Sequence, residues 1–201
     1  MERLDSYQGH SARAGVLKQQ EEKMKKLLIV VDYQNDFVTG SLGFEKAVEL
    51  EEPIAARIRE YREMGEDGQI IFTMDTHDRH YMESQEGKHL PVAHCIEGED
   101  GWQLYGKIAD LKDDNDLVFS KHTFGSYELG EYLHKHSDEF ESVEFAGVVT
   151  NICVISNIAV TKAAMPEVPI IVDASCVASN DLSLNDAALE VMESIHVDVR
   201  R

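Results

Sequence analysis

The chain has 201 residues, of which 43% are apolar, and 38 acidic against 19 basic residues give it a formal net charge of −19. This length and apolar content suit one globular domain with a full hydrophobic core. The negative charge opposes binding to polyanions, which excludes nucleic acid and anionic membrane surfaces as expected partners and leaves small molecules. The three cysteines, Cys95, Cys153 and Cys176, show no regular spacing, and no apolar run reaches the roughly 20 residues that span a bilayer. We therefore expect a cytoplasmic protein.

Residues 1–24 have neither the apolar core nor the cleavage site of a secretory signal, and they show no sustained periodicity. They can be a disordered tail, an arm that packs on another subunit, or an upstream extension that is not part of the native chain. We favour the last, because Met24 directly before a strand would make a natural chain start. Residues 25–201 are expected to form the single domain.

In chain order, the first predicted element is a buried strand over residues 27–32, which is short, apolar and rich in β-branched side chains. An amphipathic helix follows within residues 53–61, where apolar side chains recur at helical spacing behind a proline that suits a first turn. Residues 69–75 predict a second buried strand. The segment 76–111 shows little apolar periodicity and carries four of the nine histidines, so we expect a long, functional loop.

Residues 116–120 and 143–149 predict the third and fourth strands, with a helix around residues 129–133 between them. A fifth strand is predicted over residues 169–173 and a last helix over residues 184–192. Strand and helix alternate throughout, which predicts an α/β fold: a doubly wound, mostly parallel sheet with helices on both faces, in three layers like a Rossmann fold. Such sheets bind ligands outside the carboxyl ends of their strands.

Side chains with useful chemistry stand at these strand ends. Asp32 closes the first strand, Asp75 closes the second with His77 two residues on, Lys121 follows the third, and Cys153 follows the fourth. Each alone has an ordinary explanation, since a carboxylate caps a turn, a lysine lies at the surface and a cysteine fills a core position. Together they fit nucleophilic catalysis, because a base, a cation and the start of a helix all help a cysteine to become a thiolate from a free pKa of about 8.5.

Five segments carry a resemblance to a known family. They are "VDYQNDF", "DTHDRHY", "PVAHC", "SKHTFGSY" and "GVVTNICV", in that order along the chain. In this pattern the chain resembles the isochorismatase-like cysteine hydrolases, and within them the nicotinamidase branch. The resemblance extends over residues 27–199 and implies the isochorismatase-like fold, an amidohydrolase activity and a role in NAD salvage.

The resemblance implies a catalytic triad. Cys153 matches the family's nucleophile, Asp32 its general base, and Lys121 the cation that completes the set. It also implies a cis peptide bond between Val148 and Val149, which would aim the backbone N–H groups of Val149 and Cys153 at a developing oxyanion. On this interpretation the fourth strand breaks before Cys153 in order to build an acyl-transfer site.

The resemblance also implies one divalent metal ion as cofactor. Asp75, His77 and His94 match the metal ligands of nicotinamidases, and a carboxylate with two imidazoles suits zinc first, with iron or manganese as alternatives. The metal would hold the pyridine nitrogen of the substrate and place its amide over the thiol. The ordinary alternative is a polar loop whose histidines bind nothing. The fourth ligand varies within the family, and the candidates here are Glu86, at the matching distance from His77, followed by His80 and Glu83.

Substrate contacts follow from the same comparison. Phe37 and Phe124 match family positions whose rings sandwich a planar substrate ring, although both would also fit as ordinary core residues. Leu90 and Pro91 stand where nicotinamidases usually carry another aromatic residue, which leaves the pyridine substrate open. Asn151 replaces the usual aspartate, and we expect this to change only a local hydrogen bond, since an amide can still accept one.

The predicted function is hydrolysis of nicotinamide, or a similar small aromatic amide, to its acid and ammonia through a thioester on Cys153, in a homo-oligomer. Three alternatives stay open. Ureido and carbamoyl amide hydrolases share the triad but commonly lack a complete metal set. A non-catalytic binding protein would leave the triad unexplained, and it would be favoured by a Cys153 that alkylates no faster than a free thiol. A metal-free isochorismatase would need no nucleophilic cysteine.

Overall fold

The computed structural model of the protein describes residues 24–201, so the predicted extension over residues 1–24 lies outside the described residues except for Met24. One parallel sheet forms its centre, with the strand order β3-β2-β1-β4-β5-β6. All five predicted strands are confirmed, and β6, with only three residues, is too short to give a recognisable pattern. The strands are β1 (Lys25–Val31), β2 (Gly68–Asp75), β3 (Leu117–Lys121), β4 (Phe140–Val148), β5 (Ile170–Ala178) and β6 (Asp198–Arg200).

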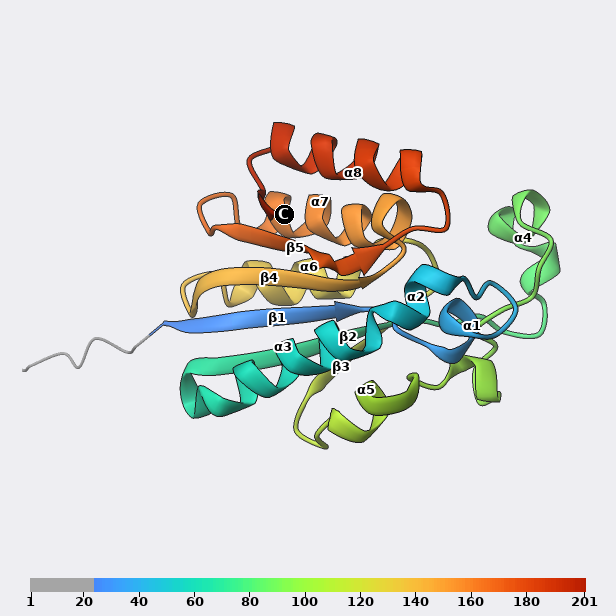
Figure 1. Ribbon diagram of the computed structural model, residues 1–201, viewed down its shortest axis with the longest axis horizontal. Coiled ribbons are helices and arrows are strands. Elements are labelled where there is room, and N and C mark those ends of the chain that lie inside the picture. Colours follow the sequence, from blue (N-terminus) through green and yellow to red (C-terminus); the bar gives the residue numbers. More distant parts are fainter. Residues whose placement is uncertain (1–23) are drawn as a thin grey trace, which may run out of the picture.

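Helices cover both faces of the sheet, which confirms the predicted doubly wound, three-layer fold (Figure 1). Helices α3 and α5 lie on one face, and α6, α7 and α8 lie on the other (Figure 1). Among the described residues, no helix combines the length and the apolar character that crossing a membrane requires. The helices are α1 (Asn35–Val38), α2 (Glu45–Glu49), α3 (Glu51–Glu63), α4 (Gln85–His89), α5 (Gly106–Leu111), α6 (Tyr127–Lys135), α7 (Ile155–Ala164) and α8 (Leu182–Ser194).

Strand β1 supplies both hydrophobic cores, because alternate side chains of a strand point to opposite faces. Leu27, Ile29 and Val31 pack in the core shared with α6, α7 and α8. Leu28 and Val30 pack in the core shared with α3 and α5. All five are fully buried, which explains why this strand is a continuous apolar run in the sequence.

The segment 76–111 is not the bare loop that its composition predicts. It contains the short helices α4 and α5 and two 3-10 turns, Tyr81–Glu83 and Asp100–Trp102. Elements of three to six residues are too short to display an apolar period, so sequence reasoning does not detect them.

The helix expected to begin near Cys153 starts later. Thr150–Val154 forms a single π-helical turn, and α7 begins only at Ile155. In this turn the N–H of Val154 donates to the carbonyl of Val149, five residues back, at 3.2 Å. Cys153 therefore lies in a wider turn between β4 and α7.

The carboxyl ends of β1 to β4 meet at one edge of the sheet. Between β1 and β4 the order in which the strands are added reverses, which is the topological switch point of the fold. Helices α1, α2 and α4 lie around this edge (Figure 1). Gly147 allows β4 to approach β1 here, because its φ is +116° and an added Cβ would lie 2.1 Å from the carbonyl oxygen of Val31. This close approach places the ends of β1 and β4 side by side.

Candidate active site

The predicted catalytic side chains converge at this edge, and we call Asp32, Lys121 and Cys153 the strand-end cluster. Asp32 follows β1, Lys121 ends β3, and Cys153 lies in the π-helical turn after β4. Lys121 Nζ lies 2.7 Å from Asp32 Oδ2 and 3.6 Å from Cys153 Sγ. None of the three residues is more than 5% exposed, so their charges interact with little screening by water.

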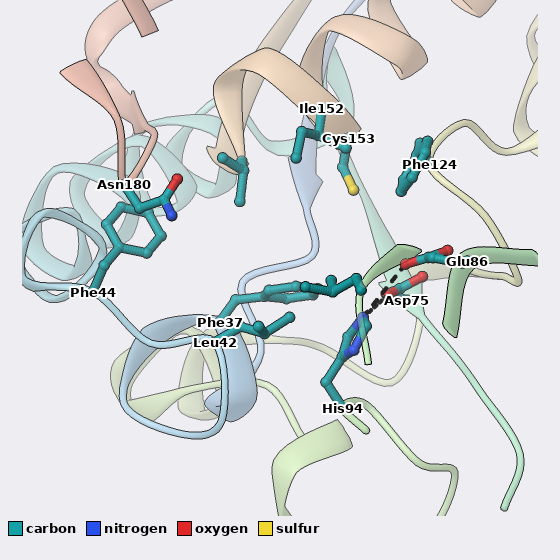
Figure 2. Close-up of a pocket in the computed structure, with 12 residues that line it drawn as sticks. Phe37, Leu42, Phe44, Asp75, Glu86, His94, Phe124, Ile152, Cys153 and Asn180 are labelled. Atoms are coloured by element: carbon teal, nitrogen blue, oxygen red, sulfur yellow. Dashed lines mark ion pairs between the residues drawn. The ribbon is translucent and has the colours of Figure 1, made fainter. Parts of the chain in front are cut away.

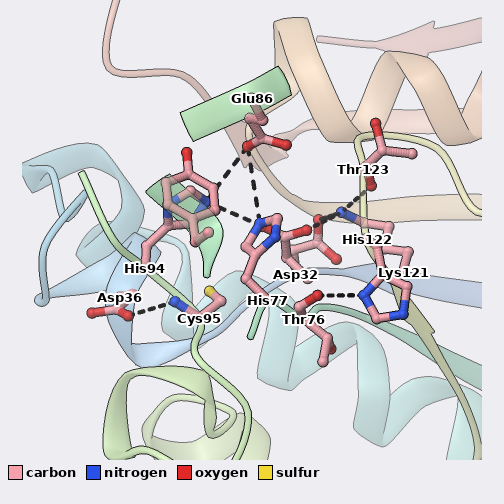
Figure 3. Close-up of polar contacts among 12 residues, drawn as sticks. Asp32, Asp36, Thr76, His77, Glu86, His94, Cys95, Lys121, His122 and Thr123 are labelled. Carbon is pink, nitrogen blue, oxygen red and sulfur yellow. Dashed lines mark hydrogen bonds and ion pairs between the residues drawn. The ribbon is translucent and has the colours of Figure 1, made fainter. Parts of the chain in front are cut away.

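Neighbouring groups fix the orientation of the strand-end cluster. Asp32 has a φ of +47°, a left-handed conformation that aspartate adopts more readily than most residues. The hydroxyl of Thr73 donates to Asp32 Oδ1 at 2.7 Å, while the other carboxylate oxygen faces Lys121. Lys121 Nζ also donates to the carbonyl oxygen of Thr123 at 3.0 Å (Figure 3). The amine is thus held between the carboxylate and the thiol.

Burial dominates the protonation of the strand-end cluster. It raises the pKa of Cys153 well above the ordinary thiol value, and the charge of Lys121 offsets this only in part. Burial also raises the pKa of Asp32, against the opposing effect of Lys121. For Lys121, burial lowers the pKa, but the charges of Asp32, Cys153 and Asp75 together outweigh it and hold the pKa above its ordinary value. Burial thus opposes the thiolate that the sequence predicts, and Lys121 is the neighbour whose charge favours it.

The backbone next to Cys153 is irregular. The peptide bond between Val148 and Val149 is cis. Asn151 lies in the following turn, and its side-chain oxygen accepts a hydrogen bond of 2.6 Å from the hydroxyl of Ser179. The amide at this position thus accepts one local hydrogen bond, as expected from its chemistry.

A second group of side chains, Asp75, His77, Glu86 and His94, is called here the carboxylate–histidine cluster. Each offers one ligand atom, and these atoms all lie within 4.8 Å of one another. Asp75 Oδ2 lies 3.0 Å from His77 Nε2 and 3.3 Å from His94 Nε2. Glu86 Oε1 lies 3.7 Å from His94 Nε2 and 4.0 Å from His77 Nε2 (Figure 3). The structure thus brings together the three predicted ligands and the preferred fourth.

The donor set fits a divalent metal ion. Nδ1 of His94 lies 2.8 Å from the carbonyl of Val92 and donates to it, so Nε2, which faces the cluster, is the ring nitrogen left to bind a metal ion. Burial and the nearby carboxylate of Asp75 raise the pKa of Glu86, a repulsion that a divalent cation would relieve. Two carboxylates and two imidazoles are common ligands of zinc, iron and manganese.

The weaker candidates for the fourth ligand lie elsewhere. His80 Nδ1 and Glu83 Oε1 are 3.4 Å from each other, and their side chains are 66% and 81% exposed. Neither belongs to the group of converging ligand atoms. The segment between Asp75 and His94 therefore supplies Glu86 to this group and turns His80 and Glu83 to solvent.

Asp75 belongs to the carboxylate–histidine cluster and also contacts the strand-end cluster. Its Oδ1 accepts a hydrogen bond of 3.2 Å from Lys121 Nζ, while its Oδ2 faces the two histidines. Burial raises the pKa of Asp75, but hydrogen bonds from the histidines and the charge of Lys121 outweigh it and hold the pKa below its ordinary value. One ionised carboxylate thus joins the two clusters.

Each cluster contributes to the wall of one cavity of about 170 Å³, the strand-end cluster through Cys153 (Figure 2). The thiol of Cys153 points into it, with Asp75, Glu86 and His94 at one end (Figure 2). Phe37 is 6% exposed and forms part of the inner wall, whereas Phe124 is 42% exposed and stands at the mouth. The rest of the wall consists of Leu42, Phe44, Leu90, Val149, Ile152 and Asn180.

Some of these positions are not found by reading the sequence. Thr73 lies two residues before Asp75 on the same strand, so its side chain points to the same face, but this spacing does not reveal its bond to Asp32. Leu42 and Phe44 lie in the connection between α1 and α2, and no pattern in the sequence links them to the cavity.

Comparisons with known proteins place the chain in a family and find similar folds. A model of the isochorismatase domain family matches residues 26–200. A Bacillus subtilis (strain 168) protein described as an uncharacterized isochorismatase family protein PncA is 32% identical over 141 residues, which cover 66% of this chain and 75% of that protein. The crystal structure of nicotinamidase PncA from Bacillus subtilis superposes with a TM-score of 0.77 at 26% identity, covering 89% of this chain and 100% of that one. N-carbamoylsarcosine amidase from Thermoplasma acidophilum superposes with a TM-score of 0.73 at 25% identity, covering 89% of this chain and 96% of that one.

Proposed function

This chain belongs to the isochorismatase family, and on that premise we propose that it converts nicotinamide, or a closely similar small aromatic amide, to the acid and ammonia. It is a hydrolase of C–N bonds in linear amides. The observation that carries the choice of substrate is that the Cys153 thiol and three residues of the carboxylate–histidine cluster line one cavity with aromatic walls. Such a cavity holds a flat ring at one end and its amide at the other.

In the proposed acylation step, Asp32 accepts the thiol proton as the sulfur of Cys153 attacks the amide carbon. A C–S bond forms, and the carbonyl oxygen becomes an oxyanion. When the oxyanion collapses, the C–N bond breaks and Asp32 returns the proton to the nitrogen, which leaves as ammonia. Lys121 stabilises the ionised forms of both residues, since its amine lies within 3.6 Å of the thiol and 2.7 Å of the carboxylate.

The proposed second step hydrolyses the thioester. Asp32 accepts a proton from water as the water oxygen attacks the acyl carbon, the C–S bond breaks, and the proton passes to the sulfur of Cys153. The backbone N–H groups of Val149 and Cys153 are assigned to the oxyanion in both steps. The product acid leaves, and the cluster returns to its starting protonation.

Asp75, His77, Glu86 and His94 are proposed to hold one divalent metal ion, with Zn²⁺ as the first candidate and Fe²⁺ or Mn²⁺ as alternatives. When bound, the ion supplies a Lewis acid that holds a ring nitrogen of the substrate and so places the amide near the thiol. Phe37 and Phe124 are proposed to contact the faces of the ring, because both line the cavity that joins the metal end to the thiol.

Hydrolysis of a ureido or carbamoyl amide is the second candidate. It is supported by the structural similarity to N-carbamoylsarcosine amidase and by Leu90, an aliphatic residue on the cavity wall where nicotinamidases usually carry an aromatic one. The assembled carboxylate–histidine cluster favours the nicotinamide proposal, because a ureido group offers no ring nitrogen for a metal to hold.

Ammonia release by purified, Zn²⁺-loaded protein tests the two candidates side by side. We expect turnover of nicotinamide that is abolished in Cys153→Ala, and at least tenfold lower kcat/KM for N-carbamoylsarcosine. A higher kcat/KM for N-carbamoylsarcosine than for nicotinamide would contradict the proposed substrate, but it would still agree with an amide hydrolase.

The remaining alternatives predict no acyl-enzyme. A non-catalytic binding protein and an isochorismatase that acts on a vinyl ether would both leave Cys153 unmodified. Slow alkylation of Cys153 would not by itself indicate a non-catalytic binding protein, because burial raises the pKa of this thiol. Mass spectrometry of acid-quenched enzyme is the sharper test, and a nicotinoyl thioester on the Cys153 peptide would contradict both alternatives.

A further inference from the structure

The turn that follows Asp32 touches both clusters, yet two of its polar side chains have no part in the proposed chemistry. It consists of Gln34 and the short helix α1, and it starts with a hydrogen bond of 2.8 Å from the N–H of Gln34 to the carbonyl of Asp32. These two side chains are Gln34 and Asp36. Each one binds backbone next to, or at, a residue of the carboxylate–histidine cluster.

Gln34 binds the backbone of Asp75 on both sides. Its side-chain oxygen accepts from the N–H of Asp75 at 2.8 Å, and its side-chain nitrogen donates to the carbonyl of Asp75 at 2.9 Å. The same nitrogen donates to the carbonyl of Trp102 at 2.8 Å. Gln34 is fully buried, so water cannot replace these bonds. The paired contacts fix the direction in which the Asp75 carboxylate leaves the backbone.

Asp36 does the same for the segment that carries His94. Its Oδ2 accepts from the N–H of Cys95, the residue after His94, at 2.8 Å (Figure 3). Its Oδ1 accepts from the N–H of Ser41 at 3.1 Å. Gly101 packs so closely on this carboxylate that an added Cβ would lie 2.1 Å from Oδ2, which confines the carboxylate on that side.

We propose that Gln34 and Asp36 are positioning residues of the metal centre, which hold Asp75 and His94 at a fixed place relative to Asp32. This inference rests on the metal site of the proposed function. The physical reason is that Asp75 comes from β2 and His94 from a segment with only short helices, which is joined to the end of β2 by a single isolated bridge between His77 and Ile96. Gln34 and Asp36 add contacts that tie both ligands to the turn after Asp32. Hydrogen bonds behind metal ligands pre-organise them, and their loss typically weakens metal binding by about 10 to 100-fold.

Zn²⁺ affinity, measured by competition with a chelator in the absence of substrate, tests the proposal. Asp36→Asn keeps the size of the side chain but can no longer accept from both Cys95 and Ser41, and we expect Zn²⁺ to bind at least about tenfold more weakly. The matched control is Asn35→Ala. It removes another hydrogen bond of the same turn, from Asn35 Nδ2 to the carbonyl of Asp100 at 2.8 Å, which is remote from any ligand in sequence. We expect this variant to bind Zn²⁺ like the wild type.

Two further measurements separate positioning from general loosening. The absorption spectrum of the Co²⁺-loaded protein reports ligand geometry, and we expect it to change in Asp36→Asn and not in Asn35→Ala. Gln34→Met provides a second, independent variant should Asp36→Asn not fold, and it too should weaken Zn²⁺ binding. Thermal midpoints of the metal-free proteins show whether Asp36→Asn and Asn35→Ala are equally stable.

The proposal is overturned if Asn35→Ala weakens Zn²⁺ binding as much as Asp36→Asn does, or if Asp36→Asn and Gln34→Met bind Zn²⁺ like the wild type with unchanged Co²⁺ spectra. It is also overturned if the wild type binds neither ion. Because the titration needs no substrate, a protein that binds metal and leaves nicotinamide intact would refute the proposed substrate without affecting this inference.

Discussion

The strand-end cluster and the carboxylate–histidine cluster share an edge of the sheet, but their residues come from different kinds of structural element. Asp32 and Lys121 stand at the ends of β1 and β3, Cys153 follows β4 at once, and all three are at most 5% exposed. The other cluster takes only Asp75 from a strand end, and its Glu86 side chain is 16% exposed on the short helix α4. The difference indicates that the sheet fixes the groups assigned to bond breaking, whereas connecting segments supply the groups assigned to substrate holding.

The two clusters are nevertheless not independent. Asp75 faces the histidines with one oxygen and Lys121 with the other. A change at Lys121 therefore affects a metal ligand, and a change at the histidines affects a neighbour of Lys121. Variants can thus separate the two clusters or disturb the link that Asp75 makes between them.

Cys153→Ala separates the clusters most completely. We expect kcat for nicotinamide to fall by at least about 10⁴-fold, because no other group in the cavity can form the acyl-enzyme. Zn²⁺ affinity should not change, since Cys153 is not among the converging ligand atoms. Steady-state kinetics and a chelator competition check the two halves of this prediction, and a large loss of Zn²⁺ affinity would contradict the division.

Lys121→Met disturbs the link itself. The buried carboxylate of Asp32 loses its cation at 2.7 Å, and Asp75 loses one at 3.2 Å. Removing one partner of a buried ion pair costs about 3 kcal/mol or more of unfolding free energy, and we expect kcat to fall by about 10³-fold as well. Denaturant unfolding beside kinetics measures both. Full stability with full activity would show that Lys121 does not hold the carboxylates.

A pair of glycine variants compares the two kinds of scaffold. Gly147→Ala places a Cβ 2.1 Å from the carbonyl of Val31 at a φ of +116°, so we expect a loss of about 3 kcal/mol in unfolding free energy. Gly98→Ala lies in the connection after His94 at a φ of +83° with open space around it, and should lose only about 1 kcal/mol. Urea titrations of both variants test this. Equal losses of unfolding free energy would contradict the idea that the strand end tolerates substitution less than the connecting segment does.

Glu86→Gln affects only the carboxylate–histidine cluster. Removing one charged ligand atom should weaken Zn²⁺ binding by about tenfold and raise KM more than it lowers kcat. Glu83→Gln, three residues earlier on the same segment and 81% exposed, is the matched control and should behave like the wild type. Similar Zn²⁺ affinity in both variants would show that Glu86 is not a ligand.

Sequence reasoning predicts the strand ends well and the connections poorly. Asp32, Lys121 and Cys153 are predictable because parallel strands end at one edge, so three distant positions must meet there. The π-helical turn at Thr150–Val154 and the bond from Thr73 to Asp32 depend on how β1, β2 and β4 pack together, which no local pattern encodes.

The double role of Asp75 shows the same limit. The resemblance to the nicotinamidase branch identifies it as a candidate ligand, but its contact with Lys121 follows only from the pairing of β2 with β3. The raised pKa of Cys153 is likewise a consequence of burial, which depends on tertiary packing.

The central claim is that one cluster holds the substrate and the other reacts with it. The most direct test is calorimetric binding of nicotinamide to Cys153→Ala, which cannot turn it over, with Zn²⁺ bound and after its removal. We expect nicotinamide to bind the loaded protein and to bind at least about tenfold more weakly when the metal is removed. Equal affinity in the two states, or no binding to the loaded protein, would contradict it.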